Sequence, residues 1–227
     1  MKSWIETADC ALGDTLCCRG TPVLRYGIHY PQFRSRYFRE VLCFINQYYR
    51  LEALRQEIHC RKVLFAQAVR QCREAMGEGR PAAPYEVDAR FRVTYGGRCA
   101  LSLYSDVYTF TGGAHGNTTR FSQTWDLCTG EISPMRAFLT AGEGDGFVRE
   151  EVLRQIRRQV GEGNEPDYFD GEEENVAQGF DPAQFYLTPT GMTVYFQQYA
   201  LAPYSSGIRE FRLPFSAWVR EPACREG

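Results

Sequence analysis

Three histidines are the side chains of this 227-residue chain best suited to acid–base chemistry at neutral pH. His29 lies in a strand-like run beside Tyr30, and His59 lies in a long helical run. Neither has a second histidine at a metal-binding spacing, and the sequence contains no HExxH motif. We therefore interpret both as structural histidines and predict neither a metal site nor a cofactor.

His115 stands in a different setting, a glycine-rich stretch between two strand-like runs. Gly112, Gly113 and Gly116 surround it, and Asn117 follows. Glycines permit positive φ angles and leave backbone amides open, so the His115 imidazole could be presented to a ligand. The simpler interpretation is a hairpin turn whose glycines serve only its geometry. The stretch lacks the lysine and following helix of a phosphate-binding loop.

A catalytic role for His115 would need a nucleophile or a carboxylate beside it. The sequence contains no GxSxG motif, and Asp106 and Asp126 are the nearby acids. No third residue completes a convincing triad with His115. We therefore predict no catalytic residue, and keep a hydrolase using His115 and a nearby carboxylate as the alternative.

Acidic side chains gather in residues 161–181, which hold eight acids and no base. They do not follow the alternating pattern of a calcium-binding EF-hand loop. A solvated loop is the simplest interpretation. Tyr168 and Phe169 lie among the acids, however, and aromatic rings supply contact area while acids steer a cationic partner. The candidate partner-binding residues are His115, Asn117, Tyr168, Phe169, Asp170, Glu172 and Glu173.

Cysteine usage and the first residues bear on the compartment. The nine cysteines are odd in number and irregularly spaced, and no CxxC motif occurs, which favours scattered reduced thiols. Acids interrupt the first ten residues where a signal peptide needs an apolar run. We therefore expect a cytoplasmic location for the chain as written, and an extracytoplasmic one if an export signal has been removed from it.

Charge and hydropathy bear on other partners. Residues 1–80 carry a net charge of +5 and residues 81–227 a net charge of -7. The basic residues alternate with acids along a helical run, which favours a solvated helix face, and no nucleic-acid-binding motif accompanies them. No stretch approaches the roughly 18 apolar residues of a membrane span. We expect neither nucleic-acid binding nor a membrane span, and a steep salt dependence would be the sign of nucleic-acid binding.

The periodicity of apolar residues predicts an α+β fold, with an antiparallel sheet packed on one side by a long N-terminal helix and further helices. A strand over 23–30, closed by Pro31, precedes a helical run over 35–76. We favour one long helix across a sheet over a break near residues 49–52. A boundary near residue 80 would separate 1–80 from a β-rich 81–227, within one compact unit. The later elements expected are strands over 85–95, 99–111 and 118–127, helices from 133–134 and over 147–160, a hairpin of 185–187 with 192–199, and a closing strand over 208–214.

Four sequence segments carry a family resemblance. They are YTFTGGAHG at 108–116, WDLCTGEI at 125–132, FYLTPTGMTVYF at 185–196 and YALAPY at 199–204. Together they resemble the paired domains of unknown function that form the ectodomain of the lysozyme-sensing anti-sigma-V factor. This pair also occurs beside a peptidoglycan deacetylase domain in Gram-positive bacteria.

The resemblance is specific over residues 85–215 and looser over 20–80. It implies an α+β fold and a binding role, with a lysozyme-like or other basic protein as partner. The leading hypothesis is a non-enzymatic module that recognises a protein or a cell-wall-related ligand through its loops. The alternative is the hydrolase or deacetylase-like enzyme that uses His115.

Overall fold

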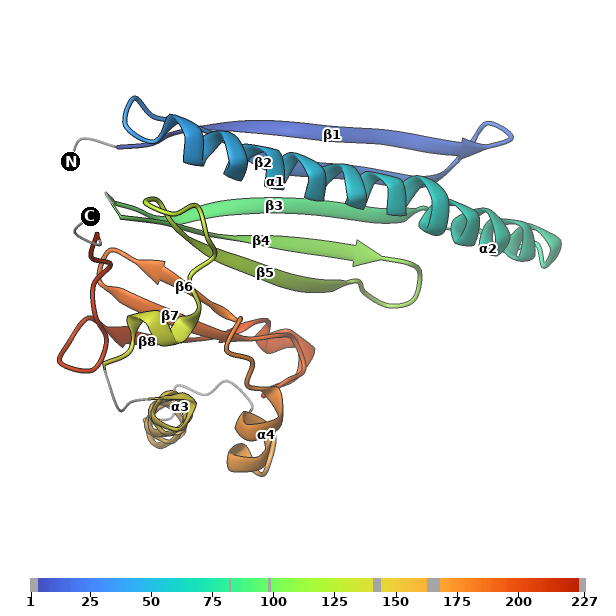
Figure 1. Ribbon diagram of the computed structural model, residues 1–227. Coiled ribbons are helices and arrows are strands. Elements are labelled where there is room, and N and C mark those ends of the chain that lie inside the picture. The colour runs from blue at the N-terminus through green and yellow to red at the C-terminus, as the bar shows by residue number, and fades with distance from the viewer. Residues whose placement is uncertain (1–3, 82, 98, 141–143, 163–167, 225–227) are drawn as a thin grey trace. The chain divides into compact units, whose positions relative to one another are not determined.

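The computed structural model describes residues 4–81, 83–97, 99–140, 144–162 and 168–224. The strands form a five-stranded sheet in the order β1-β2-β3-β4-β5 and a three-stranded sheet in the order β6-β7-β8 (Figure 1). With its helices, this arrangement confirms the α+β class. The N-terminal unit comprises Ile5–Phe91 and Ser105–Thr119. The C-terminal unit comprises Trp4, Arg92–Tyr104 and the described residues from Arg120 onward.

The N-terminal unit begins with a long hairpin of β1 (Glu6–Cys18) and β2 (Thr21–Arg34), paired antiparallel. Arg19 and Gly20 join the strands with φ angles of 52° and 84°. Positive φ at both turn residues matches the right-handed twist of the paired strands. The sequence did not predict β1, because most of its side chains are exposed and show no alternation of apolar and polar residues.

The second strand also extends beyond its predicted end. Pro31 pairs with Asp9 of β1, and β2 continues to Arg34, so the prediction that Pro31 closes this strand was wrong. A proline removes only its own N–H from the ladder, and the following residues restore the pairing. Phe33, for example, is buried, and its N–H donates to the side chain of Asn46 on the following helix.

One long helix follows β2, as predicted, with no break near residues 49–52. It consists of α1 (Arg39–His59), a π-helical segment (Cys60–Leu64) and α2 (Phe65–Gly77), and runs along the sheet in Figure 1. Its buried residues face β2 and β3 (Tyr85–Gly96). They are Leu42, Ile45, Tyr49, Ala53, Cys60, Leu64, Ala68, Cys72 and Ala75.

The helix explains a correction to the expected sheet. Strands β2 and β3 pair in parallel, with Leu24 opposite Tyr85 and Ile28 opposite Ala89. Parallel neighbours need a long crossover connection, and the helix provides it. The five-stranded sheet is therefore mixed rather than purely antiparallel.

The C-terminal unit contains most of the remaining elements. Strands β4 (Ala100–Phe110) and β5 (Asn117–Asp126) close the first sheet, and each contributes residues to both units. The second sheet and two helices follow. They are α3 (Asp145–Gly161), α4 (Glu172–Gly179), β6 (Phe185–Thr188), β7 (Gly191–Phe196) and β8 (Arg209–Pro214).

Two expectations in this unit need correction. The helix predicted from residues 133–134 is only a short 3-10 turn over Met135–Phe138, because burying Met135 and Phe138 takes a single turn. The acidic segment, whose simplest interpretation was a solvated loop, contains α4 over Glu172–Gly179. Asp167 and Glu165 of that segment lie outside the described residues.

The cysteines do not all remain reduced. Cys99 and Cys224 form a disulfide, which joins the residue before β4 to the end of the described chain. This corrects the expectation of scattered thiols for these two residues, whose separation of 125 residues gives no local signal. The other seven cysteines, all described, are free. Among the described residues, no helix combines the length and apolar character needed to cross a bilayer.

Candidate functional site

Two segments far apart in sequence meet on the C-terminal unit. The Phe169 N–H donates to the Leu201 carbonyl oxygen at 2.9 Å. At the other end of α4, a Cβ atom at Gly179 would lie 3.2 Å from the Phe196 ring and 3.4 Å from the Ala200 methyl. Residues 168–179 therefore pack along 196–201, and a larger residue at Gly179 would push them apart.

Tyr168 anchors this arrangement. Its hydroxyl donates to Gln159 Oε1 of α3 at 2.7 Å and accepts a hydrogen bond from Arg209 at 3.1 Å. The Arg209 guanidinium also lies 5.2 Å from the centroid of the Tyr168 ring. The predicted contact residue Tyr168 is thus partly buried and held by β8 and α3, where it positions its neighbour Phe169.

Two exposed aromatic rings flank the junction of these segments. Phe169 is 39% exposed and Tyr199 is 49% exposed. Tyr199 has a φ angle of 65°, a left-handed conformation that costs free energy for a bulky residue. Its ring lies 6.0 Å from that of Tyr204. Such strain concentrates at functional positions, so it makes Tyr199 a candidate that the sequence did not reveal.

Acidic side chains follow Phe169 directly in the sequence. Glu172 and Glu173 begin α4 and lie 3.6 Å and 2.6 Å from the guanidinium of Arg157. The positive end of the helix dipole favours acids in this first turn. Asp170 and Glu174 are exposed beside them in the sequence, so this segment carries four carboxylates, two of them paired with Arg157. We call Phe169, Asp170, Glu172, Glu173, Glu174 and Tyr199 the acidic–aromatic surface.

The glycine-rich loop lies in the N-terminal unit, in a different setting. Gly112 and Gly113 have φ angles of 98° and 94°. A Cβ atom at Gly116 would lie 2.5 Å from the Tyr108 ring, so these glycines satisfy the loop's own geometry. His115 is exposed, with Nδ1 3.0 Å from the Gly116 carbonyl oxygen, and Asn117 is exposed at the start of β5.

The groups considered for catalysis have structural contacts. Asp126 Oδ1 accepts hydrogen bonds from the N–H groups of Cys128 at 2.7 Å and Thr129 at 3.3 Å, which fixes the turn after β5. His29 Nδ1 lies 2.9 Å from an Asp9 carboxylate oxygen. Within the described part of the chain, no three His, Cys, Asp or Glu side chains are grouped to hold a metal ion.

Comparisons with known proteins agree with this architecture. Residues 18–118 match the family model described as "Deacetylase PdaC", and residues 141–216 match "Protein of unknown function (DUF3298)". The two matches follow each other along the chain, as in the paired domains that the sequence resembles. The family resemblance is therefore confirmed. No protein with a curated description matches the sequence.

Two solved structures of the DUF3298 family show the same fold. A member from Bacteroides fragilis has a TM-score of 0.68 and 16% identity, over 97% of this chain and 95% of that one. A protein from Pseudomonas aeruginosa has a TM-score of 0.55 and 18% identity, over 92% of this chain and 90% of that one. At these identities, the likeness extends to the fold alone.

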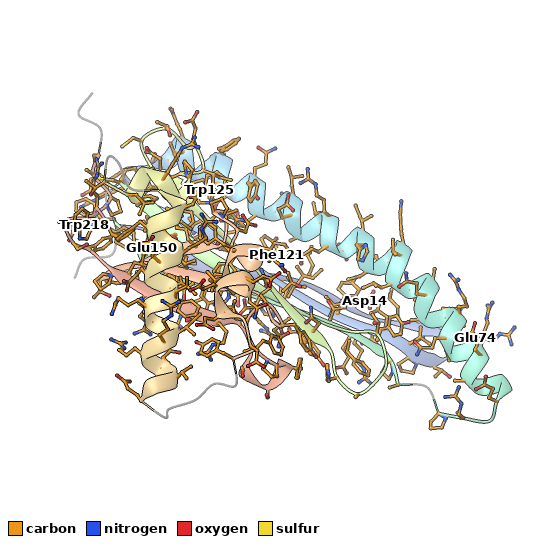
Figure 2. All side chains as sticks on the ribbon, turned by 90° about the horizontal axis from the view of Figure 1, so that it is seen from below. Asp14, Glu74, Phe121, Trp125, Glu150 and Trp218 are labelled. Atoms are coloured by element: carbon orange, nitrogen blue, oxygen red, sulfur yellow. A yellow bond between two sulfur atoms is a disulfide. The ribbon has the colours of Figure 1, made fainter. Side chains whose placement is uncertain are left out.

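Some of the residues that carry the family resemblance are core residues. Trp125, labelled in Figure 2, is 2% exposed, and Leu187 and Phe196 are fully buried. Ser102 links their strands, since its hydroxyl lies 2.7 Å from Thr124 Oγ1 and accepts the Leu187 N–H at 2.9 Å. The buried residues of these segments therefore specify packing, whereas the acidic–aromatic surface shares only Tyr199 with the segments.

Proposed function

We propose that this chain is a non-enzymatic binding module that recognises a basic protein through its acidic–aromatic surface. One observation carries the proposal: the segments of the exposed Phe169 and Tyr199 rings, one on a strained backbone, meet at the Phe169–Leu201 hydrogen bond, and four acids follow Phe169 directly in the sequence. Large rings bury area at little entropic cost, and exposed acids attract cationic side chains. This chemistry favours a protein partner over a neutral cell-wall carbohydrate.

The surface assigns distinct roles to its residues. Phe169 and Tyr199 provide the contact area, and Glu173 and Glu174 steer the partner. Arg157 pairs with both Glu172 and Glu173 and offsets their mutual repulsion, while the surface stays net negative. The hydrogen bond of Tyr168 to Gln159 holds this loop in place before a partner binds, so binding costs little conformational entropy.

A lysozyme, as a basic protein of the kind that the resemblance implies, is a suitable probe. We expect Phe169→Ala and Tyr199→Gly each to weaken its binding about tenfold or more, because exposed aromatic anchors dominate such interfaces. The control is Phe121→Ala, which removes an exposed ring of β5, labelled in Figure 2, and should leave the dissociation constant unchanged. Equal affinity in all four proteins would contradict the proposal.

The second candidate function is a hydrolase or deacetylase-like enzyme. It is favoured by the "Deacetylase PdaC" match, which includes the exposed His115. The test is deacetylation of an N-acetylated oligosaccharide by the wild-type protein and His115→Ala. Activity that disappears in a correctly folded His115→Ala protein would favour the enzyme. Lysozyme binding by both proteins, without activity in either, would favour the binding module.

We also infer an oxidising, extracytoplasmic location. Its support is the Cys99–Cys224 disulfide, a bond that cytoplasmic thiol systems keep reduced in most proteins. Alkylation of thiols in intact cells, followed by mass spectrometry, should find Cys99 and Cys224 protected and Cys128 modified. Modification of all three would instead favour the cytoplasm.

A further inference from the structure

A recess lies in the N-terminal unit, lined by residues of the long helix, β3 and β4. It has a volume of about 280 Å³, and its floor is formed by Val87 and Val107. Leu64 and Cys60 close one side, and Arg55 and His59 stand at the helix edge. An apolar cavity of about 150 Å³ already accommodates benzene, so this recess is large enough for a molecule with one ring.

The helix is distorted at this place. The π-helical segment Cys60–Leu64 supplies two of the lining residues. Such segments are rare and occur frequently at functional sites, because the inserted residue turns side chains out of the regular helical pattern. The line of buried apolar residues is also interrupted here, since Gln56 and Glu57 stand between Ala53 and Cys60.

Gln56 leaves an acceptor without a partner beside the recess. Its Oε1 is buried and has no hydrogen-bond partner among the described residues. The neighbouring Glu57 is occupied, because it accepts hydrogen bonds from Tyr26 at 2.8 Å and Arg61 at 3.1 Å. A buried acceptor without a donor destabilises the fold, so a donor supplied by a ligand would be favourable there.

The charge and polarity of the other lining residues indicate which class of ligand fits the recess. Burial raises the pKa of the Cys60 thiol to about 11, so this group stays neutral and does not attack a ligand at neutral pH. Val87, Val107 and Leu64 offer only apolar contact. Arg55, at the edge, forms an ion pair with Glu52, so its charge is balanced and does not select a charged ligand.

We propose that this recess binds a small, uncharged, single-ring molecule whose O–H or N–H group donates a hydrogen bond to Gln56 Oε1. The ring lies against Val87 and Val107, beneath the π-helical segment. This site is independent of the acidic–aromatic surface, which belongs to the other unit. A ligand bound in the recess, or a variant that removes the recess, would therefore leave lysozyme binding unaffected.

Phenol and toluene are matched probes, because they share a ring and differ in the hydrogen-bond donor. We expect saturable phenol binding, observed as shifts of the backbone amide signals of residues 55–64, 87 and 107–109 in NMR spectra. Toluene should bind about threefold to tenfold more weakly, the range expected for one hydrogen bond. Gln56→Leu should remove this difference, whereas Gln47→Leu, at an exposed position of α1, should preserve it.

Val107→Phe should fill the recess and prevent binding of both probes. If this variant does not fold, Gln56→Leu alone decides between the outcomes. The proposal is contradicted if neither probe shifts these signals in the wild-type protein, because the recess would then bind neither ring. It is equally contradicted if Gln56→Leu retains the preference for phenol.

Discussion

Arg120 shows how a single residue organises the C-terminal unit. Its side chain is 8% exposed, forms an ion pair with Glu210 of β8 and lies 3.7 Å from the centroid of the Tyr104 ring. Its backbone N–H donates to Gln197 Oε1 at 3.0 Å, and its carbonyl accepts from Gln197 Nε2 at 2.7 Å. Arg120 therefore links β5 to β8 and to the end of β7.

Replacing Arg120 with alanine should lower the free energy of unfolding by about 3 kcal/mol. This value is at the low end of the range for a broken buried pair, because Glu210 is 35% exposed and regains water. Urea unfolding of both proteins measures the difference. Arg25→Ala removes an exposed pair with Glu86 and should change stability by less than about 1 kcal/mol. Equal losses in the two variants would contradict this role for Arg120.

At the residue scale, the sequence predicted the composition of the candidate surface better than its geometry. The acids and Phe169 were recognised from their clustering, because charge and aromaticity are properties of the residue itself. Tyr199 was not recognised, since its importance comes from a left-handed backbone and its exposure. Residues 196–201, which include Tyr199, pack against residues 168–179, and no local sequence pattern encodes this contact.

The helix α3 shows how an element is held by a few polar contacts. Gln155, 8% exposed, donates to the Arg212 carbonyl oxygen of β8 and to Glu151 Oε1, each at 2.8 Å. The hydrogen bond from Arg154 holds the pKa of Glu151 below its ordinary value, with help from Gln155. The charged form of Glu151 therefore stabilises the fold.

This lowered pKa predicts a pH dependence. The stabilisation is present above the ordinary pKa of a glutamate, about 4.3, and is lost as the pH falls through the lower folded-state value. Glu151→Gln should therefore lower stability by less than about 1 kcal/mol at pH 7, and the difference should be smaller at pH 3. Urea midpoints at the two pH values test this. An equal difference at both pH values would show that Glu151 acts through packing instead.

Elements whose apolar residues follow one clear periodicity were predicted from the sequence. Elements that depend on contacts between distant segments were not. The long helix and α3 followed from apolar residues at helical spacing. By contrast, β1 exposes most of its side chains and depends on pairing with β2. The parallel pairing of β2 with β3 depends on where the helix crosses the sheet, which periodicity does not specify.

At the scale of the whole molecule, one covalent bond spans much of the chain. The Cys99–Cys224 disulfide closes a loop of 125 residues. In the chain-entropy description, such a bond stabilises the folded state by restricting the unfolded chain, and long loops gain most. The end of the described chain thus becomes part of the C-terminal unit.

Removing this bond with Cys99→Ser and Cys224→Ser together should lower stability by about 2–5 kcal/mol. Thermal unfolding with and without a reductant provides the measurement. The reductant should lower the melting temperature of the wild-type protein and leave that of the double variant unchanged. Cys128→Ser, which replaces an exposed free thiol, should behave like the wild-type protein. A wild-type melting temperature insensitive to complete reduction would contradict this account.

The fold was predictable because the resembling segments include core residues such as Trp125 and Phe196, whose packing specifies the fold. Because these core residues are buried, they give little information about binding partners. The candidate surface was identified only in part, because its rings and acids meet through the Phe169–Leu201 backbone contact.

The central claim is that the acidic–aromatic surface binds a basic protein. Its most direct test is calorimetric titration of the protein with a lysozyme at low and at physiological salt. We predict saturable binding that weakens with salt but persists, because aromatic contacts are not screened while the carboxylates are. The double variant Phe169→Ala/Tyr199→Gly should not bind at physiological salt. No binding by the wild-type protein at either salt, or undiminished binding by the double variant, would contradict the claim.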